Sequence, residues 1–375
     1  METGDSLPSA PPRPPRSPRL KKLALAVLLL WVATWLRFHH LGAQSFWNDE
    51  GNSARLSERT LQLIIEGTAS DIHPPLYYLL LRGWRELLGD SEFALRALSA
   101  FAGLLVVPLA LAGNRQLAIV NRQLSMSLLV GLITAVSPPL IYYSQEARMY
   151  ALLGLLAALA TWLLLRIADC GFRNTAHGSR ITLVTAYVLT AVAGLYTHYF
   201  FPAVLAAHGV VVVVLWLKDS RVKIDDAPRH KSSRFNLLSW AAMMLAALLL
   251  YLPWLPIFLA NVGGGGAIRP SLLPFLADTL FWLGFGSTVG PPTIPWPFVA
   301  LGVLLVTGVV FNWGRRTAVA LITLLVPILF LYLSGATSPQ YFKFLTAVIA
   351  PFAVVVGGQR LKIKDWRRNR QSLIF

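Results

Sequence analysis

The chain has 375 residues, of which 55% are apolar and only 13% are charged, and its mean hydropathy is +0.59. A typical soluble domain is about a quarter charged, so this composition excludes a water-soluble fold. It predicts an all-α protein that crosses a membrane several times. The net charge of +16 invites a nucleic-acid interpretation, which depends on where the basic residues fall. The single cysteine, Cys170, excludes an intrachain disulfide and a multi-cysteine metal site.

Residues 1–19 are rich in proline and arginine and predict a disordered cytoplasmic tail. Ten stretches then reach or approach the length of about 17–25 apolar residues that a membrane-spanning helix requires. They lie near 20–37, 96–113, 123–143, 148–166, 181–197, 199–217, 236–259, 297–313, 317–334 and 341–358. The predicted membrane domain therefore covers 20–358, and residues 359–375 form a basic cytoplasmic tail.

Residues 76–88 are mostly apolar but form a segment too short to span a membrane. Three charged residues, Arg82, Arg85 and Glu86, fall on one stripe of the predicted helix. This pattern is typical of a helix that lies in the membrane interface. If the segment is not a span, 24 of the 33 Lys and Arg fall on one side of the membrane. The positive-inside rule then places both termini in the cytoplasm. Because these basic residues are spread over separate loops facing anionic lipid, membrane lipids and not nucleic acid are the expected partners.

This topology leaves two long loops on the outer face, 38–95 and 260–296, which favours a functional site there. The second loop contains Val262–Pro270, with four consecutive glycines, and Gly286–Pro297, on either side of an apolar piece at 272–285. The glycines indicate either a mobile hinge or a plain flexible linker. Their spacing does not match a phosphate-binding loop or a dinucleotide fingerprint.

Acidic residues concentrate in the first outer loop, which holds eight of the 17 carboxylates. They are Asp49, Glu50, Glu58, Glu66, Asp71, Glu86, Asp90 and Glu92. Asp49 and Glu50 follow an aromatic pair just beyond the first span, so a carboxylate is expected at the membrane surface. There it could act as a general base toward a hydroxyl. Alternatively, Asp49 caps the following helix, which the sequence predicts from about Asn52.

A histidine in the same loop is held by its neighbours. Pro74 restricts His73 to an extended conformation beside Asp71. Pro75 suits the first turn of the predicted 76–88 helix. We therefore expect a histidine with a fixed position, although a lone loop histidine is usually inert.

Further turns at the same membrane level carry polar side chains. Two prolines, Pro138 and Pro139, are expected to distort the outer end of the third span. Glu146 and Arg148 then precede the fourth span, where the spacing predicts that Glu146 and Tyr150 share a helix face. A Glu–Arg pair in this place is either structural or part of a site.

The two remaining outer turns contribute a histidine and a lysine. Tyr196, His198 and Tyr199 lie between the fifth and sixth spans, and Tyr341 and Lys343 lie in the last outer turn. Lys343 would either snorkel to lipid headgroups or meet a phosphate. The other candidate histidines, which we expect to be structural or solvated, are His177, His208 and His230.

Five segments carry a family resemblance: SFWNDEGNSA, DIHPPLYYLLLRGW, GDSEFALRALSAFAG, IYYSQEARMYALL and LYTHYF, in that order. Together they resemble the GT-C membrane glycosyltransferases related to the dolichyl-phosphate-mannose protein mannosyltransferases. The bacterial branch that includes lipid A sugar transferases is the most similar. The likeness covers about 20–217 well and 236–358 more loosely.

The resemblance implies a GT-C fold and transfer of a hexose or pentose from a polyprenyl-phosphate donor, with inversion. The acceptor would be a hydroxyl of a lipid, glycan or protein, on the outer face of the plasma (inner) membrane. No cofactor is implied. By the family's pattern Asp49 would be the base and Glu50 would orient it. Arg148, His198 and Lys343 would meet the lipid phosphate, and Asp71, His73, Glu146, Tyr150 and Tyr341 would shape the substrate site.

Several alternatives stay open. Many relatives have an arginine before the last outer tyrosine, where this chain has Gln340, so its phosphate contact would shift to Lys343. A cation held by Asp49 and Glu146 is an alternative to metal-free chemistry. The chain ends soon after the tenth span, so acceptor recognition is expected from the two outer loops or a partner. The competing functions are a transporter or flippase, which would carry ionisable residues near mid-bilayer, and a non-catalytic envelope assembly protein.

Overall fold

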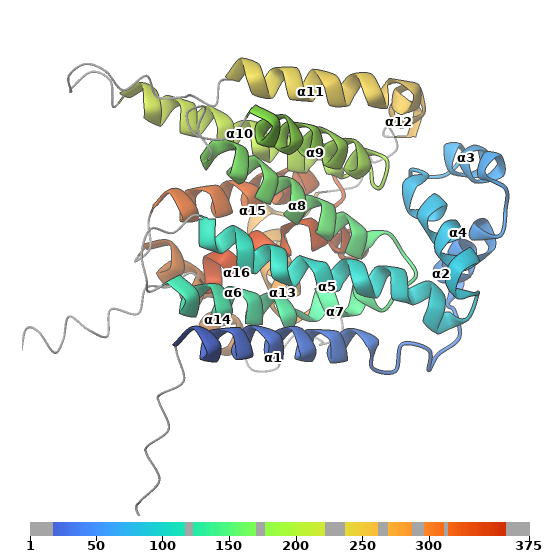
Figure 1. The fold of residues 1–375 in the computed structure, drawn as a ribbon, viewed down its shortest axis with the longest axis horizontal. Coiled ribbons are helices and arrows are strands. Elements are labelled where there is room, and N and C mark those ends of the chain that lie inside the picture. The colour runs from blue at the N-terminus through green and yellow to red at the C-terminus, as the bar shows by residue number, and fades with distance from the viewer. Residues whose placement is uncertain are drawn as a thin grey trace, which may run out of the picture.

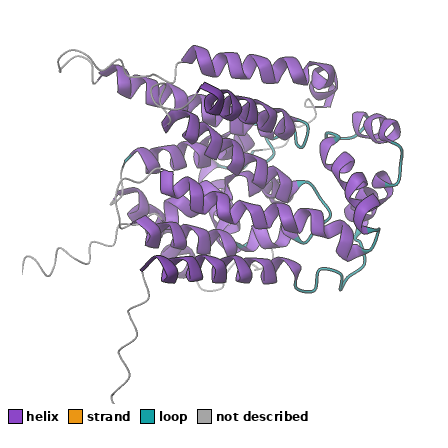
Figure 2. Cartoon of the chain, viewed as in Figure 1, coloured by secondary structure: helices purple, strands orange, loops and turns teal. Residues whose placement is uncertain are grey.

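The computed structural model describes residues 18–116, 123–169, 177–221, 237–261, 269–286, 296–310 and 314–357. These residues form helices joined by turns and contain no strand, which confirms the all-α prediction (Figure 2). Residues 1–17 of the predicted 1–19 tail and all of the predicted 359–375 tail lie outside the described residues, as do Cys170, His230 and the four glycines of the second outer loop. The last two residues of the predicted N-terminal tail, Pro18 and Arg19, already belong to a helix.

Apolar helices of 7 to 25 residues build a bundle, in which the longer helices run side by side (Figure 1). They are α1 (Pro18–Phe38), α5 (Glu92–Gln116), α6 (Gln123–Ala135), α7 (Pro138–Ser144), α8 (Tyr150–Asp169), α9 (His177–Leu195), α10 (Phe201–Arg221), α11 (Leu237–Tyr251), α12 (Leu255–Asn261), α14 (Trp296–Val310), α15 (Arg315–Leu333) and α16 (Ile349–Gly357). The α5 helix packs against α6 and α8, and α8 in turn packs against α9. The core of the bundle therefore lies around α5 and α8.

The chain is a multi-pass membrane protein. Within the described residues, four helical segments are long and apolar enough to cross a membrane, or five if α6 and α7 form one bent span. Six shorter apolar helices accompany them, of which five fall on predicted spans and the sixth lies in the second outer loop. The count of ten spans stays a prediction.

Three short helices lie together beyond one end of the bundle, where α1 finishes and α5 begins (Figure 1). They are α2 (Asn48–Ser57), α3 (Leu61–Ala69) and α4 (Leu76–Leu88). The α4 helix has 13 residues, as the sequence predicts, and it packs against α2 and α5 and buries Tyr77, Tyr78 and Leu81. We call the end of the bundle covered by these helices the capped end.

The predicted helix from about Asn52 is wrong in its boundaries. The α2 helix already begins at Asn48, and the chain breaks before α3, whose first turn is capped by the Thr60 hydroxyl at 3.3 Å from the Leu63 N–H. Asp49 therefore lies inside the first turn of α2 and does not cap it. A carboxylate in a first turn is still stabilised by the helix dipole.

The third predicted span is bent, as its prolines predict. The axes of α6 and α7 differ by 53°, and the break falls just before Pro138. Two 3₁₀ helices, η1 (Leu252–Trp254) and η2 (Pro339–Val348), lead into α12 and α16. The second outer loop contains α13 (Leu272–Phe285), which packs against α7 and η2.

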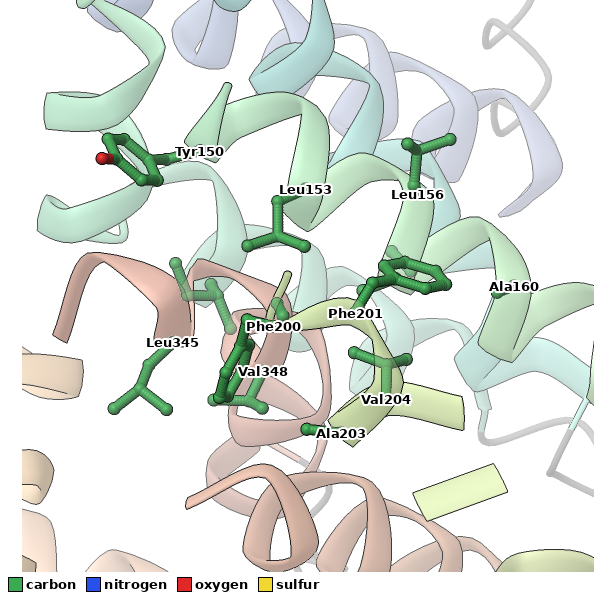
Figure 3. Close-up of a cluster of buried hydrophobic side chains, with 14 of the residues drawn as sticks. Tyr150, Leu153, Leu156, Ala160, Phe200, Phe201, Ala203, Val204, Leu345 and Val348 are labelled. Carbon is green, nitrogen blue, oxygen red and sulfur yellow. The ribbon is translucent and has the colours of Figure 1, made fainter. Parts of the chain in front are cut away.

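The helix α8, the start of α10 and η2 meet in an apolar cluster (Figure 3). Tyr150 lies at its edge, at the first residue of α8. The Thr346 hydroxyl donates to the Tyr150 carbonyl at 2.9 Å, and a Cβ on Gly154 would lie 3.1 Å from the Thr346 carbonyl oxygen. Only a glycine allows α8 and η2 to approach this closely without a shift, so η2 is fixed against the first turn of α8.

Candidate active site

The structure brings most of the predicted residues together at the capped end. They come from five chain segments that are far apart in the sequence: the start of α2, the loop before α4, the turn between α7 and α8, the turn between α9 and α10, and η2. Most of the described loops also gather at this end of the bundle (Figure 2). The site is therefore assembled by the bundle and not by one continuous motif.

Glu50 is buried in a saturated ion pair. Its two carboxylate oxygens accept from Arg96 Nε at 2.8 Å and from Arg96 Nη2 at 2.7 Å. One of them also accepts from the backbone N–H of Ala147 at 2.8 Å. The remaining Arg96 donors reach the carbonyls of Leu41, Gln44 and Ser45. Glu50 is 1% exposed, so it joins α2 to α5 and to the turn before α8 and has no free face for a substrate.

Asp49, the adjacent residue, has a very different environment. Its side chain is 32% exposed, and one oxygen lies 3.4 Å from Arg148 Nη2. The other terminal nitrogen of Arg148 donates to the Asp49 backbone carbonyl at 3.3 Å. The carboxylate is thus placed by Arg148 but keeps an open side, which a proton acceptor requires.

The turn between α7 and α8 carries Glu146. The prediction that Glu146 and Tyr150 share a helix face is wrong, because α8 begins only at Tyr150 and Glu146 lies in the turn before it. Glu146 is 7% exposed, and burial raises its pKa from 4.5 to about 7, although the Tyr142 hydroxyl bonds to it. This carboxyl group therefore holds its proton to a higher pH than an exposed glutamate does.

His73 lies between the carboxylate of Asp71 and the guanidinium group of Arg148. Its Nδ1 is 3.4 Å from an Asp71 carboxylate oxygen, and its Nε2 is 3.5 Å from Arg148 Nη2. His73 is 7% exposed, whereas the Asp71 side chain is about half exposed at the rim. Burial lowers the pKa of His73, and the hydrogen bond to His73 lowers the pKa of Asp71. At neutral pH the pair is a neutral imidazole beside a carboxylate.

His198 faces His73 across the site, with ring centroids 6.0 Å apart. Its Nδ1 accepts from the backbone N–H of Phe200 at 3.0 Å. Its Nε2 is buried and has no hydrogen-bond partner among the described residues. Burial holds the pKa of His198 well below its ordinary value, so the ring is neutral and Nε2 carries the hydrogen. A buried donor without a partner is costly and indicates a place where a ligand oxygen can bind.

Two cations lie close to the ring of Tyr150. Lys343 Nζ is 5.0 Å and the Arg148 guanidinium carbon 5.7 Å from the ring centroid. Lys343 makes no ion pair with any described residue. Arg148 Nε is buried and has no hydrogen-bond partner among the described residues. The ring centroids of Tyr341 and Phe344 are 5.7 Å apart. The half-buried Lys343 thus faces the site.

The sequence did not reveal the residues that hydrogen-bond to the site residues and fix their positions. Arg96 fixes Glu50, and the Ser99 hydroxyl, bonded to Tyr77, donates to the Arg148 carbonyl at 2.9 Å. Gln145 donates to the Leu36 carbonyl at 3.1 Å and so attaches the turn to the end of α1. A signal was available for Arg96, because an arginine in an apolar helix needs a partner at that depth.

An apolar cavity of about 450 Å³ adjoins the site. Pro75 and Leu76, two and three residues after His73, line it, and so does Tyr196, two residues before His198. The Leu76 N–H donates to the Tyr196 carbonyl at 3.0 Å, so one backbone contact joins the walls of the cavity to both histidine segments. The cavity walls are almost entirely apolar and suit a hydrocarbon chain.

Other predicted groups lie elsewhere. His208 is buried inside the bundle, where its ring bonds to Tyr187 at 2.9 Å and to Thr161 at 3.0 Å, as expected for a structural histidine. His177 begins α9. Among the described residues, no group of three or more His, Cys, Asp and Glu side chains is arranged to hold a metal ion.

The helical bundle with its capping helices is the fold of the GT-C membrane glycosyltransferases, as the sequence predicts. The chain matches no protein-family model and no curated protein sequence. Solved structures therefore carry the comparison.

The fold is similar to that of ArnT from Cupriavidus metallidurans, solved in the apo state and bound to undecaprenyl phosphate. The TM-score is 0.60 for both, at 17% and 16% identity, and the match covers 95% of this chain. It is also similar to the oligosaccharyltransferase of Archaeoglobus fulgidus, with a TM-score of 0.54 at 12% identity over 95% of this chain. This chain spans 62% of the ArnT chain and 52% of the archaeal one.

Proposed function

We propose that this protein is a glycosyltransferase that moves a sugar from a polyprenyl-phosphate donor to an acceptor hydroxyl on the outer face of the plasma membrane, with inversion. The observation that carries the proposal is the meeting of an open carboxylate, Asp49, with donors that have no hydrogen-bond partner among the described residues. These donors are Arg148 Nε, His198 Nε2 and the Lys343 ammonium group.

In this reaction the acceptor oxygen attacks C1 of the sugar and its proton passes to the Asp49 carboxylate. The bond between C1 and the phosphate oxygen breaks, and the electron pair leaves with the polyprenyl phosphate. The new glycosidic bond forms on the opposite face of the sugar, which gives inversion. Asp49 supports this role because its side chain is 32% exposed, whereas the neighbouring Glu50 is saturated. A positioned base of this kind contributes about 10²–10⁴ in rate.

The leaving phosphate gains negative charge in the transition state, so fixed positive groups lower the barrier. Arg148 and Lys343 supply charge, and the neutral His198 supplies an N–H donor. Lys343 takes the place of the arginine that Gln340 replaces in the family's pattern. Asp71, His73, Glu146, Tyr150 and Tyr341 then line or support the substrate site.

The apolar cavity beside the two histidine segments supports a lipid-linked substrate, because its walls offer a hydrocarbon chain an apolar surface. ArnT, whose fold is similar, has been solved bound to undecaprenyl phosphate. Since the chain spans 62% of ArnT, these shared features support the donor class and leave the sugar and the acceptor to experiment.

The proposal is tested by comparing the cell-envelope lipids, glycans and proteins of cells that make the wild-type protein with those of cells that lack it, by mass spectrometry. We expect one species that gains a single hexose or pentose only when the protein is present. Cells that make the Asp49→Asn variant should lack it, whereas Asp90→Asn, the same chemical change at an exposed residue of the same loop, should restore it. An unchanged set of glycosylated species with and without the protein would refute the proposal.

A further inference from the structure

We infer that His73 does not contact the substrate but is a positioning residue: backed by Asp71, it accepts a hydrogen bond from Arg148 and orients that guanidinium toward the donor phosphate. The inference rests on the proposed function. It assigns to the two histidines of the site, His73 and His198, opposite hydrogen-bonding roles that their residue type alone does not reveal.

The neighbours of His73 permit one neutral tautomer. An ionised carboxylate only accepts and a guanidinium only donates. Asp71 Oδ2 lies 3.4 Å from Nδ1, so Nδ1 carries the hydrogen, and Arg148 Nη2 lies 3.5 Å from Nε2, so Nε2 presents its lone pair. Both neighbours require the same tautomer, and with both nitrogens used the ring has no polar atom left for a sugar or a phosphate.

Asp71 is itself held in place. Its Oδ1 accepts from the backbone N–H of Ile72 at 2.7 Å, which turns Oδ2 toward His73. On the other side, Pro74 and Pro75 are buried, and the Leu76 N–H is bonded to the Tyr196 carbonyl at 3.0 Å. The imidazole therefore has little freedom to move, as positioning a long arginine side chain requires.

Arg148 needs several contacts because each of them is long. Its terminal nitrogens lie 3.3 Å from the Asp49 carbonyl, 3.4 Å from the Asp49 carboxylate, 3.4 Å from the Tyr150 hydroxyl and 3.5 Å from His73 Nε2. All four contacts are at the weak end of hydrogen-bond geometry, so no single one orients the guanidinium. His73 contributes a buried neutral acceptor whose ring Asp71 holds, and Nε keeps no hydrogen-bond partner among the described residues.

His198 has the complementary arrangement. The Phe200 N–H occupies Nδ1, so the hydrogen is on Nε2, which has no described partner. The charged and titratable groups that act on the two rings are Asp71, Arg148, Lys343 and the other histidine. Of the two rings, only His198 offers a free donor to a phosphate oxygen.

The tautomers can be tested without any substrate, by nitrogen NMR of histidine-labelled protein in lipid nanodiscs, with the two signals assigned from His73→Gln and His198→Gln variants. We expect the Nδ1–H tautomer for His73 and the Nε2–H tautomer for His198. Undecaprenyl phosphate is then added. The His198 Nε2 signal should shift strongly and the His73 signals little. An Nε2–H tautomer at His73, or a shift there as large as that at His198, would overturn the inference.

Affinity for undecaprenyl phosphate supplies a second readout, because a positioning role must act through Arg148. His73→Leu should weaken binding about tenfold, the scale of one hydrogen bond to a charged group. His73→Gln, whose amide oxygen can replace Nε2 as acceptor, should recover most of that loss. In an Arg148→Met background, His73→Leu should have no further effect. The exposed His39→Gln serves as the matched control.

The outcomes separate the two proposals. Equal losses from His73→Leu with and without Arg148 would overturn the positioning role while the donor class stands. If the wild-type protein does not bind undecaprenyl phosphate at all, the proposed function fails, and the tautomer measurement still decides whether Asp71 and Arg148 fix the His73 ring.

Discussion

Two ion pairs at the capped end, Glu50–Arg96 and Asp49–Arg148, have their acids side by side in the first turn of α2 but differ in geometry and in burial. The first is bidentate, at 2.7 and 2.8 Å, and buried on both sides. The second is a single 3.4 Å contact whose acid is 32% exposed. A saturated pair holds a fold together, whereas an open pair keeps groups available for a ligand.

The same contrast explains why the first pair must be intact for the second to function. Glu50 also accepts from the Ala147 N–H, one residue before Arg148. The Glu50–Arg96 pair, here called the closed pair, therefore fixes the distance between α2 and the turn that carries Arg148 of the Asp49–Arg148 pair, here called the open pair. Adjacent acids in the sequence thus divide the tasks of architecture and chemistry between them.

The largest expected effect is a loss of stability when the closed pair is broken. Arg96→Leu leaves the Glu50 carboxylate buried without a partner and should destabilise the protein by about 3–5 kcal/mol. The measurement is denaturation in detergent, followed by helical circular dichroism. Arg85→Leu, which removes the pairs of the half-buried Arg85 with the exposed acids Glu58 and Asp90, is the control and should change stability by about 1 kcal/mol or less. Equal stability of the Arg96 variant and the parent would contradict the structural role.

Breaking the Asp49–Arg148 pair should instead lower the rate of sugar transfer. Arg148→Met should reduce sugar transfer by about 10²–10³, the usual effect of removing one stabilising donor from a charge-developing site. Its thermal stability should stay close to that of the wild type, because the 32% exposed Asp49 can be hydrated when its partner is lost. A variant that loses stability as severely as Arg96→Leu would show that both pairs are architectural.

A smaller effect is expected at Lys343. Lys343→Ala removes one charged donor, worth about 1.5–3 kcal/mol, and should weaken undecaprenyl phosphate binding by about tenfold to a hundredfold. Lys343→Arg keeps the charge and should bind more tightly than the alanine variant. Equal affinity of all three proteins, measured in nanodiscs, would remove Lys343 from the phosphate site.

A further effect concerns the dependence of stability on pH. Because burial raises the pKa of Glu146 from 4.5 to about 7, the folded protein holds its proton over a range in which the unfolded chain releases it. Stability from this group is fully present below pH 4.5, falls as pH rises to about 7, and is constant above, with a slope of at most about 1.4 kcal/mol per pH unit. Glu146→Gln should flatten denaturation midpoints measured across this window. An unchanged slope would contradict the assignment.

The sequence predicts the membrane class, the 76–88 helix and the bend at Pro138, because each follows from local composition or from the geometry of proline. It does not predict the start of α2 at Asn48 or the turn that separates Glu146 from α8. A tertiary contact lies near both boundaries: Glu50, in the first turn of α2, bonds to Arg96 and to the Ala147 N–H in the turn before α8. Periodicity carries no information about such a contact.

For the site, residue type and order were sufficient to select the turns that meet, including those of Asp49, His73, Arg148 and His198. Residue type and order alone do not separate Asp49 from Glu50 or His73 from His198, because the members of each pair have similar chemistry. The family resemblance assigned them different roles, and the structure adds the physical difference. The difference lies in which hydrogen-bonding atoms are already used, and that depends on residues up to 97 positions away.

The central claim, that Asp49 accepts the acceptor's proton, is tested most directly by the rate of polyprenyl phosphate release from a polyprenyl-phosphate sugar donor in nanodiscs supplied with envelope lipid extract. Asp49→Asn should bind undecaprenyl phosphate with nearly wild-type affinity but release product about 10²–10⁴ times more slowly, while Asp90→Asn keeps the wild-type rate. An Asp49→Asn variant that releases polyprenyl phosphate as fast as the wild type would contradict the account.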